Sequence, residues 1–520
     1  MVIRKQRTND KPMTEGSVAS DKTKEVFIGA IDQGTTSSKF IIFSLDGEVI
    51  SVAQEEHGQI HLKPGYCEHN PESLMVHINS CIEQALLKFE EKGYKRSQLA
   101  SVGVTNQRET TVLWDAETGQ PFYNAIVWHD VRNGPLVDEL CNKVGGKYGL
   151  YAKTGLSIST YPSATKLQWI INNVPEAREA MKEGRARFGT IDSWVLWRLT
   201  GRHITDITNA SRTMLFDIHK KAWDPELCAL VGVDPSCLPE VVPSSAVYGK
   251  VTSKNCPLSK LNVVISGCMG DQQAALFGQN CFHPGEMKCT YGTGCFLLQQ
   301  AGPTAPEVDP ASGLLTTIAY DIDGTVCYAI EGAVACAGSM FQWLRDDVGI
   351  YSRTSEIEPL AREVDSSEGV ILVPAFTGLF APRWRPDARA CIVGMTFRTN
   401  RCHIMRAALD AVSFQVVDVV KAMGGAQKLS VDGGMTVNRL LMQTQADQLG
   451  VDVEVSSMPE VTALGAAMAS GLAVGLYKDF DDIKAHGGKK STVTPTSTAE
   501  QREAWSEQWE KGIARALDWV

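Results

Sequence analysis

In Ile28-Gly-Ala-Ile-Asp-Gln-Gly-Thr-Thr-Ser-Ser-Lys-Phe-Ile-Ile42, a short polar turn joins two apolar runs. Backbone N–H groups and hydroxyls of such a turn converge on one concavity, which binds an anion through partial charges fixed in advance. Asp32 offers oxygen ligands for Mg²⁺, and Lys39 adds a positive charge. The stretch therefore predicts strand, phosphate turn and strand, with phosphate contacts from Thr35, Thr36, Ser37 and Lys39. An ordinary hairpin with a polar turn is the alternative.

Length and composition indicate a large enzyme with small ligands. The chain has 520 residues, of which 43% are hydrophobic, and this exceeds what a single core usually supports. The formal charge of -10 argues against nucleic acid or an anionic membrane as the main partner. We therefore expect two domains and no nucleic-acid partner.

Cysteine usage and the termini indicate a cytoplasmic protein. The fourteen cysteines are scattered without a C-x2-C pair, which is typical of reduced thiols in the cytosol. Residues 1–25 carry mixed charges and no apolar core of a signal peptide, so we expect a disordered leader. No run approaches the length of a membrane span, and we expect none.

The chain repeats one pattern of strands and helices. Strands over 39–45 and 48–54 are joined by Asp46-Gly47, and a helix follows from Asn70 and Pro71 to Gly93. A similar order returns after residue 286, with Asp323-Gly324 between two more strands. Further helices are expected at 332–348, 400–423 and 435–449, and further strands at 262–266, 369–373, 428–431 and 451–457. This is an α/β chain with a structural duplication.

Three further elements suit a nucleotide. The turn Tyr291-Gly-Thr-Gly-Cys-Phe296 offers Thr293 as a second phosphate donor, although a glycine hairpin without a ligand explains it equally well. Two glycine–amide pairs then share a spacing of four residues, which places each pair on one helical face where a flat base fits beside an amide. These pairs are Gly338 with Gln342 and Gly434 with Asn438. Close helix packing beside an exposed amide is the alternative for either pair alone.

Two phosphate turns and two glycine–amide helices in one duplicated chain are an improbable coincidence. A dinucleotide fold requires G-x-G-x-x-G and a P-loop requires G-x4-G-K-[ST], and neither occurs in its required context. We therefore expect the nucleotide to be held between two phosphate turns.

With these residues, the chain resembles the FGGY carbohydrate kinases of the actin-like ATPase fold, and within them the glycerol kinases. The resemblance covers about residues 26–515 and includes five motifs besides the first turn. They are Thr105-Asn-Gln-Arg-Glu-Thr110, Asn124-Ala-Ile-Val-Trp128, Ser266-Gly-Cys-Met-Gly-Asp-Gln-Gln-Ala-Ala-Leu-Phe277, Tyr291–Phe296 and Pro374-Ala-Phe-Thr-Gly-Leu-Phe-Ala-Pro382.

The resemblance implies the fold and the reaction. We expect two duplicated ribonuclease H-like domains, 26–278 and 279–520, with a cleft between them that closes on binding both substrates. The implied reaction is Mg²⁺-dependent transfer of the ATP γ-phosphoryl group to a terminal hydroxyl of glycerol, which gives sn-glycerol 3-phosphate and ADP. A homodimer is also implied.

The resemblance also implies the acceptor site. Charged and amide partners suit the hydroxyls of a small triol, and an apolar wall suits its carbon edge. The implied glycerol contacts are Arg108, Glu109, Trp128, Tyr161, Asp271, Gln272 and Phe296. Without the resemblance, the sequence indicates that Arg108 and Glu109 are a solvated surface pair and that Trp128 is an aromatic residue of the core.

Asp271 is the expected general base, because it follows a strand where open α/β sheets bind ligands. An N-cap role is the alternative and is compatible with it. Asp32 and Asp271 are the expected metal residues, with Asp32 acting through water. One departure is Lys39, where glycerol kinases usually carry Arg, since lysine keeps the charge but lacks the bidentate fork.

Two rival functions remain open from the sequence. One is a kinase of the same fold for a pentulose or another polyol, although the compact set of acceptor residues favours glycerol. The other is a nucleotide-switched chaperone or filament protein of the same ATPase fold, although the chain lacks an appended peptide-binding domain. Dependence of ATP turnover on an acceptor separates a kinase from a switch.

Overall fold

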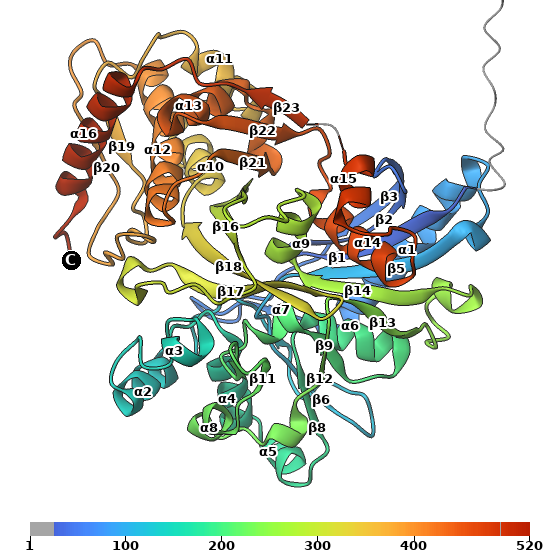
Figure 1. Ribbon diagram of the computed structural model, residues 1–520. Coiled ribbons are helices and arrows are strands. Elements are labelled where there is room, and N and C mark those ends of the chain that lie inside the picture. Colours follow the sequence, from blue (N-terminus) through green and yellow to red (C-terminus); the bar gives the residue numbers. More distant parts are fainter. Residues whose placement is uncertain (1–24, 489) are drawn as a thin grey trace, which may run out of the picture.

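The computed structural model describes residues 25–488 and 490–520 (Figure 1). Apart from Glu25, the leader expected at 1–25 lies outside the described residues. Two large sheets, each flanked by helices, stand beside a smaller lobe that carries most of the short strands and helices. The α/β class predicted from the sequence is confirmed.

The first sheet has six strands. They are β1 (Phe27–Gln33), β2 (Ser37–Ser44), β3 (Val49–Glu56), β5 (Leu99–Asn106), β13 (Ser245–Lys250) and β14 (Val264–Gly270), in the order β13-β14-β5-β1-β2-β3. β1, β5 and β14 run parallel, and β2 returns antiparallel beside β1. The predicted turn Asp46-Gly47 joins β2 to β3, with Gly47 in the left-handed region at φ +76°. The strand expected at 262–266 instead runs from Val264 to Gly270.

One face of this sheet is covered by α1 (Pro71–Glu91) and α6 (Ile191–Thr200). Asn70 caps α1 as predicted, because its side chain accepts hydrogen bonds from the backbone N–H groups of Glu72 and Ser73. All seven residues of the predicted apolar stripe are buried: Leu74, Ile78, Cys81, Ile82, Ala85, Leu86 and Phe89. Burial of this stripe fixes the helix on the sheet.

The other face is covered by α9 (Asp271–Gly278) and by α14 (Val461–Ala473), a helix from late in the sequence. Glycine on the strands allows α14 to approach closely. A Cβ atom on Gly103 would lie 2.2 Å from the carbonyl oxygen of Ala466, and one on Gly267 would lie 2.5 Å from the backbone nitrogen of Ser470. The last third of the chain therefore completes the core of the first sheet.

The second sheet has seven strands. They are β15 (Met287–Tyr291), β16 (Cys295–Gly302), β17 (Leu315–Ile322), β18 (Thr325–Val334), β21 (Lys428–Asp432), β22 (Asp452–Ser456) and β23 (Lys490–Val493), in the order β17-β18-β16-β15-β21-β22-β23. β15 pairs antiparallel with β16 through a glycine turn and parallel with β21. β1 has the same two relations to β2 and β5, so the predicted duplication is confirmed.

Six helices and one pair of short strands accompany the second sheet. The helices are α10 (Gly338–Asp346), α11 (Ile357–Ala361), α12 (Arg401–Ala422), α13 (Arg439–Leu449), α15 (Phe480–His486) and α16 (Ala499–Ala516), and the strands are β19 (Ile371–Val373) and β20 (Cys391–Val393). The expected helix at 332–348 was wrong at its start. Gly332 to Val334 extend β18, where they pair with β16, and α10 begins at Gly338.

The smaller lobe is built mostly from the chain between β5 and β13 and has its own apolar core (Figure 1). Its strands pair in twos: β4 (Glu68–His69) with β7 (Ala125–Ile126), β6 (Val112–Asp115) with β8 (Ala186–Gly189), β9 (Ile204–Asp206) with β12 (Glu240–Val242), and β10 (Phe216–Asp217) with β11 (Ala222–Trp223). Its helices are α2 (Gly134–Val144), α3 (Tyr151–Thr154), α4 (Ser163–Asn173), α5 (Pro175–Lys182), α7 (Ile207–Ala210) and α8 (Pro225–Leu230).

Short 3-10 turns occur in all parts of the described chain, at Arg96–Gln98, Pro235–Cys237, Pro257–Lys260, Pro310–Ser312, Thr354–Glu356 and Gly434–Val437.

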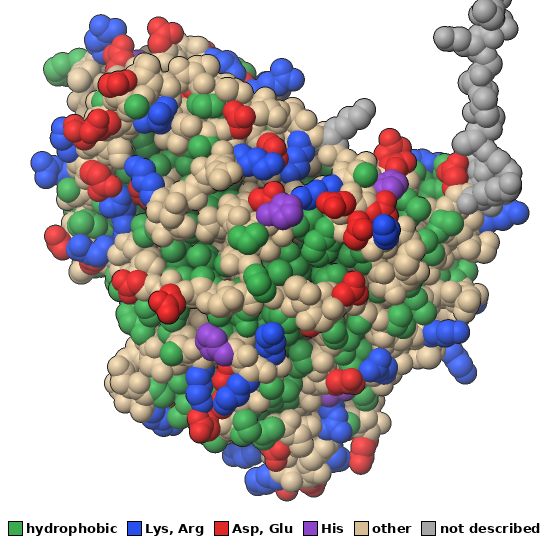
Figure 2. Space-filling view, viewed as in Figure 1, with side chains coloured by type: hydrophobic (Ala, Val, Ile, Leu, Met, Phe, Trp, Pro, Cys, Tyr) green, Lys and Arg blue, Asp and Glu red, His purple; other side chains and the backbone are tan. Residues whose placement is uncertain are grey.

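Charged side chains of both signs cover the face of the molecule shown in Figure 2. On the face shown in Figure 2, basic and acidic side chains are interspersed rather than gathered into a single basic patch. Among the described helices, none combines the length and the apolar character that crossing a membrane demands.

Candidate active site

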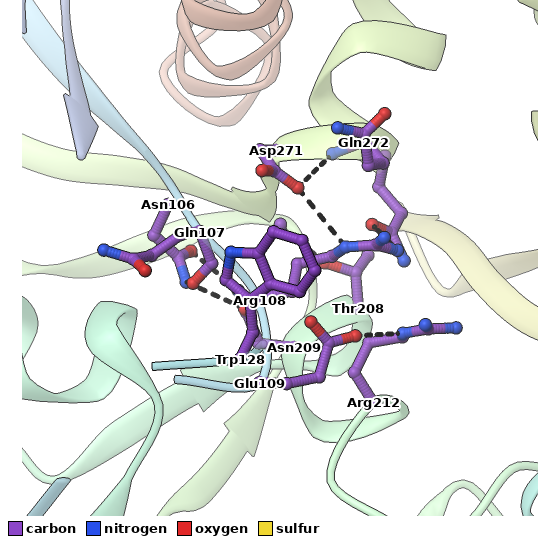
Figure 3. A network of polar contacts seen from close by, with 12 residues as sticks. Asn106, Gln107, Arg108, Glu109, Trp128, Thr208, Asn209, Arg212, Asp271 and Gln272 are labelled. Carbon is purple, nitrogen blue, oxygen red and sulfur yellow. Dashed lines mark hydrogen bonds and ion pairs between the residues drawn. The ribbon is translucent and has the colours of Figure 1, made fainter. Parts of the chain in front are cut away.

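Three predicted residues come together at the carboxyl ends of neighbouring parallel strands. Asp32 lies near the end of β1, Arg108 follows β5, and Asp271 follows β14 as the first residue of α9. Because β14, β5 and β1 are adjacent in the sheet, their ends meet at one edge, where open α/β sheets bind ligands. Arg108 Nε lies 3.3 Å from Asp271 Oδ1 (Figure 3).

Arg108 is buried and held by a carboxylate that the sequence did not single out. Its Nη1 and Nη2 donate to Oε2 and Oε1 of Glu331 at 2.6 and 2.9 Å, a bidentate pair. Its Nη2 also lies 3.3 Å from the hydroxyl oxygen of Tyr161. Arg108 is therefore a buried guanidinium at the centre of the site, not a solvated surface group.

Glu109 has a buried partner of its own. Arg212 Nε donates to Glu109 Oε1 at 2.6 Å, and Arg212 Nη2 lies 3.3 Å from Glu331 Oε1. Glu109 also takes a positive φ of 58°, uncommon outside glycine, which turns the chain directly after Arg108. Figure 3 shows Glu109 and Arg212 facing one another beside Arg108.

Three aromatic rings stand together next to these charges. The ring centroid of Trp128 lies 5.4 Å from that of Tyr161 and 6.4 Å from that of Phe296, both in edge-on arrangements. The indole Nε1 of Trp128 donates to Thr35 Oγ1 at 3.0 Å, which ties this wall to the first phosphate turn. Trp128 and Phe296 are only partly buried, so their faces remain available to a ligand.

Asp271 is accessible to a ligand although the charges around it are not. Its side chain is 31% exposed, and its Oδ1 accepts a hydrogen bond from the backbone N–H of Gln272 at 2.7 Å. Burial raises the pKa of Asp271, and Arg108 and Lys288 oppose the rise. Gly270 is the N-cap residue of α9 and no side chain caps this helix, so the capping role considered for Asp271 was wrong.

Gln272 is oriented by a buried lysine. Lys288 on β15 donates to Gln272 Oε1 and, at 2.9 Å, to Thr290 Oγ1. Burial lowers the pKa of Lys288. The second sheet thus fixes the side-chain amide of Gln272, one of the expected glycerol contacts.

The first phosphate turn has the tight geometry expected of it. Gly34 N–H donates to the carbonyl oxygen of Ser37 at 2.9 Å, and Asp32 lies opposite Lys39 in the β1–β2 ladder. Lys39 Nζ forms an ion pair with Glu460 Oε2 at 2.7 Å, so Glu460 competes for the charge predicted to face phosphate.

Asp32 is a carboxylate with other carboxylates nearby. Burial raises the pKa of Asp32 to about 7, Lys39 opposes the rise, and Glu460 and Asp271 add to it. Crowded carboxylates at one sheet edge are the donor set that Mg²⁺ prefers, so Asp32 and Asp271 fit the predicted ion. Among the described residues, a group of three possible metal ligands within 4.8 Å of one another lies elsewhere, at Asp192, Asp206 and Cys268. There, hydroxyl donors already satisfy the two carboxylates.

The second phosphate turn is joined directly to the start of α10. Ala337 N–H donates to the carbonyl oxygen of Thr293, and Gly338 N–H donates to that of Gly292, each at 3.0 Å. Thr293 is exposed at the tip of the turn. Glycine is required at 338, because a Cβ there would lie 2.6 Å from the Gly292 oxygen.

All four predicted glycine and amide residues line one cavity of about 790 Å³ in the second half of the chain. They are Gly338, Gln342, Gly434 and Asn438, and apolar side chains including Phe341, Ile357 and Leu441 line the cavity with them. Its size and mixed lining fit a nucleoside.

The expected helical face shared by Gly434 and Asn438 was wrong. Gly434–Val437 form a 3-10 turn, and Asn438 is the N-cap of α13, whose Oδ1 accepts from Leu441 N–H at 2.9 Å. The two residues still line the same cavity, but the carbonyl oxygen of the Asn438 amide is committed to the helix. Its amide nitrogen is the group left for a ligand.

The geometry can be set beside known proteins. Residues 27–278 match the FGGY family of carbohydrate kinases, N-terminal domain, and residues 287–474 match the C-terminal domain of the same family. The chain belongs to the FGGY family of carbohydrate kinases. Of the expected acceptor residues of this FGGY kinase, Phe296 lies in the second matched region and the others lie in the first.

Curated relatives of this FGGY kinase match nearly their full length. A glycerol kinase from Acidiphilium cryptum is 48% identical, over 95% of this chain and 99% of its own. One from Azorhizobium caulinodans is 49% identical over the same shares of the two chains.

Solved structures give the same fold. Plasmodium falciparum glycerol kinase with ADP superimposes with a TM-score of 0.89 at 38% identity, covering 95% of this chain and 98% of its own. A ligand-bound xylulose kinase from Lactobacillus acidophilus reaches 0.83 at 20% identity, covering 94% and 97%, which extends the likeness in fold.

Sequence reasoning missed four charged residues of this FGGY kinase: Arg212, Lys288, Glu331 and Glu460. Two of them carried a readable signal. Lys288 and Glu331 stand inside apolar strands, and a charge buried there needs a partner. Arg212 and Glu460 follow no such pattern, and only the tertiary fold brings them to the site.

Proposed function

We propose that this protein is a glycerol kinase, which transfers the ATP γ-phosphoryl group to a terminal hydroxyl of glycerol and gives sn-glycerol 3-phosphate and ADP. The observation that carries the proposal is the acceptor cluster, where Arg108, Glu109 and Asp271 stand beside the wall of Trp128 and Phe296. Identity of 48–49% to glycerol kinases over 95% of the chain supports it.

The cluster matches the chemistry of a small triol. Each buried hydroxyl needs both a donor and an acceptor, and one left unpaired costs about 1 to 3 kcal/mol. Arg108 and the Gln272 amide donate, while Glu109 and Asp271 accept. The aromatic wall, completed by Tyr161, covers the carbon edge and excludes longer sugars that need a wider, more polar pocket.

Proton transfer falls to Asp271. Its carboxylate accepts the proton of the attacking hydroxyl while that oxygen approaches the γ-phosphorus in line. Burial, which raises the pKa of Asp271, makes it a stronger base than an ordinary carboxylate. Arg108, 3.3 Å away, limits that rise.

The nucleotide lies across the cleft between the two sheets. The adenosine part occupies the cavity lined by Gly338, Gln342, Gly434 and Asn438, and the phosphates lie against the turns that carry Thr293 and the group Thr35, Thr36, Ser37 and Lys39. Asp32 and Asp271 would hold Mg²⁺, which would neutralise charge on the phosphoryl oxygens. Backbone N–H groups of both turns orient the phosphates.

We also propose two domains, 26–278 and 279–520, each built on one of the two large sheets. The protein is proposed to act in the cytoplasm, which suits fourteen cysteines that are all free thiols. A homodimer is the proposed assembly, and light scattering of the purified protein tests it.

The test is ADP release from Mg·ATP with a panel of polyols and sugars. A glycerol kinase turns over with glycerol far faster than with erythritol, xylulose or no acceptor. Equal turnover without any acceptor would indicate an ATPase switch, and preference for a pentulose would indicate a sister kinase.

A further inference from the structure

Glu331 on β18 is a carboxylate with both oxygens fully engaged. Its Oε2 accepts from Arg108 Nη1, and its Oε1 accepts from Arg108 Nη2 and Arg212 Nη2, at distances of 2.6, 2.9 and 3.3 Å. The side chain is only 2% exposed. Burial alone would raise the pKa of Glu331, but Arg108 and Arg212 outweigh burial and lower it to about 2.

The two arginines that bind Glu331 connect it to Arg108 and Glu109, two adjacent residues of the proposed glycerol site. Arg108 is itself an acceptor residue, and Arg212 binds Glu109, the other one, at 2.6 Å. The four side chains form a neutral chain in which charges alternate in the order Arg108, Glu331, Arg212 and Glu109. Glu331 is the member that joins the two arginines.

Glu331 also comes from the opposite part of the fold. Arg108 and Glu109 follow β5 of the first sheet, whereas β18 belongs to the second sheet. The guanidinium of Arg108 therefore has its position set by a residue of the second sheet.

We propose that Glu331 is a positioning residue for acceptor recognition, which holds Arg108 directly and Glu109 through Arg212 in the geometry that binds a polyol. This inference rests on the proposed glycerol kinase activity. It assigns Glu331 no contact with the substrate.

Loss of Glu331 would leave Arg108 and Arg212 without their shared carboxylate. The nearest other carboxylate to Arg108 is that of Asp271, 3.3 Å from Nε. Without Glu331, Arg108 moves toward Asp271 and withdraws from the polyol. Arg212 likewise loses the group that aligns it against Glu109. Both effects act on the acceptor, and neither touches the cavity at Gly338 and Asn438.

The experiment measures glycerol and ADP binding separately by calorimetry, on metal-free protein for glycerol. Glu331→Gln keeps the side-chain size and removes the charge. We expect glycerol to bind at least about tenfold more weakly, since breaking a buried charge pair is costly, with the Kd for ADP unchanged. Steady-state rates should show the same split, with a raised KM for glycerol and an unaltered KM for ATP.

The matched control is Glu68→Gln. Glu68 is equally buried and paired with Arg132 at 2.7 Å, and its side-chain partners Tyr123, Asn124 and Arg132 are not among the acceptor residues. It should lower thermal stability as Glu331→Gln does and leave the Kd for glycerol unchanged. Equal loss of glycerol affinity in both variants would mean that Glu331, like Glu68, only stabilises the fold, and it would overturn the inference.

Glu331→Asp is the second variant, in case Glu331→Gln does not fold. It keeps the charge and shortens the side chain, so it should bind glycerol more tightly than Glu331→Gln and more weakly than the wild type. Wild-type affinity in either folded variant would contradict the inference. The polyol panel on the wild type tests the proposed function independently, and the polyol it prefers is the ligand for the Glu331 variants.

Discussion

Lys39 Nζ lies 2.7 Å from Glu460 Oε2, an ion pair between the strand after the first phosphate turn and the residue that precedes α14. Both side chains are about one-fifth exposed, so the pair does not belong to the fully buried core. The cation expected to meet phosphate therefore already has a partner, and nucleotide binding has to compete with Glu460.

Removal of that competition should strengthen nucleotide binding. In Glu460→Gln, Lys39 no longer has an anionic partner, and we expect ADP to bind about two- to fivefold more tightly, the range of a partly exposed ion pair. Calorimetric titration with ADP measures it. Glu510→Gln, which removes a partner of Arg383 on a distant surface, is the control and should leave the Kd unchanged. Weaker ADP binding in Glu460→Gln would mean that Lys39 needs its partner for alignment.

Loss of the carboxylate at 271 should stop chemistry without preventing binding. Asp271→Asn keeps the hydrogen bond from Gln272 N–H to the side-chain oxygen but cannot accept a proton, so kcat should fall about 10²- to 10⁴-fold. Glycerol and ADP affinities, measured by calorimetry, should stay within a few-fold. Asp224→Asn changes a buried aspartate that caps α8, and it should lower the Tm while kcat is retained. A kcat for Asp271→Asn near the wild-type value would exclude Asp271 as the base.

Asp32 should make stability pH-dependent in the metal-free protein. Burial raises its pKa from 3.8 to about 7, so the folded state binds an extra proton between these values. The contribution of Asp32 is complete below about pH 4 and is lost as the pH rises through about 7. In Asp32→Asn, the free energy of unfolding should fall less between pH 4 and 7. Denaturant melts across that range decide it, and identical pH profiles would refute the expectation.

Metal uptake should release a proton at the same group. At pH 6 Asp32 is largely protonated and has to lose its proton to Mg²⁺, whereas at pH 8 it is already ionised. Calorimetry in two buffers of different ionisation enthalpy should show proton release at pH 6 that is absent at pH 8. Asp32→Asn should abolish the release, and its persistence in the variant would assign the proton to another group.

Two glycines of the nucleotide cavity should respond differently to alanine. A Cβ at 338 meets the Gly292 oxygen at 2.6 Å, whereas a Cβ at 434 meets no atom within 4 Å. Gly338→Ala should lower the Tm and activity together because it displaces the second phosphate turn. Gly434→Ala should keep the wild-type Tm and bind ADP more weakly, since its methyl group enters the cavity. Thermal melts with and without ADP separate the two, and unaltered ADP affinity in Gly434→Ala would move the nucleotide elsewhere.

Much of the secondary structure could be predicted from residues adjacent in the sequence. The Asp46-Gly47 turn, the Asn70 cap and the apolar stripe of α1 were predicted from adjacent residues, because backbone conformation and helix period depend on near neighbours. Boundaries failed where pairing decides them. Gly332 to Val334 have a composition compatible with a helix, but they extend β18 because β16 lies beside them.

Site residues that directly follow a strand could be predicted from the sequence. Site residues that depend on partners far away in the sequence could not. Asp32, Arg108 and Asp271 follow three strands whose order in the sheet brings them together. Arg212 is separated from Glu331 by more than a hundred positions, and no local pattern announces the contact. The error at Asn438 is similar, because a glycine followed by an amide fits a helix, a 3-10 turn or a cap equally well.

α14 lies on the first sheet although it belongs to the last part of the chain, so the two halves are not separable pieces of polypeptide. A fragment that ends at residue 278 would leave the face around Gly103 and Gly267 bare and exposed to water. Such a fragment should aggregate when produced alone, and a peptide that carries Val461–Ala473 should rescue its solubility. During synthesis, the first half has to wait for nearly the entire chain to emerge before its core is sealed.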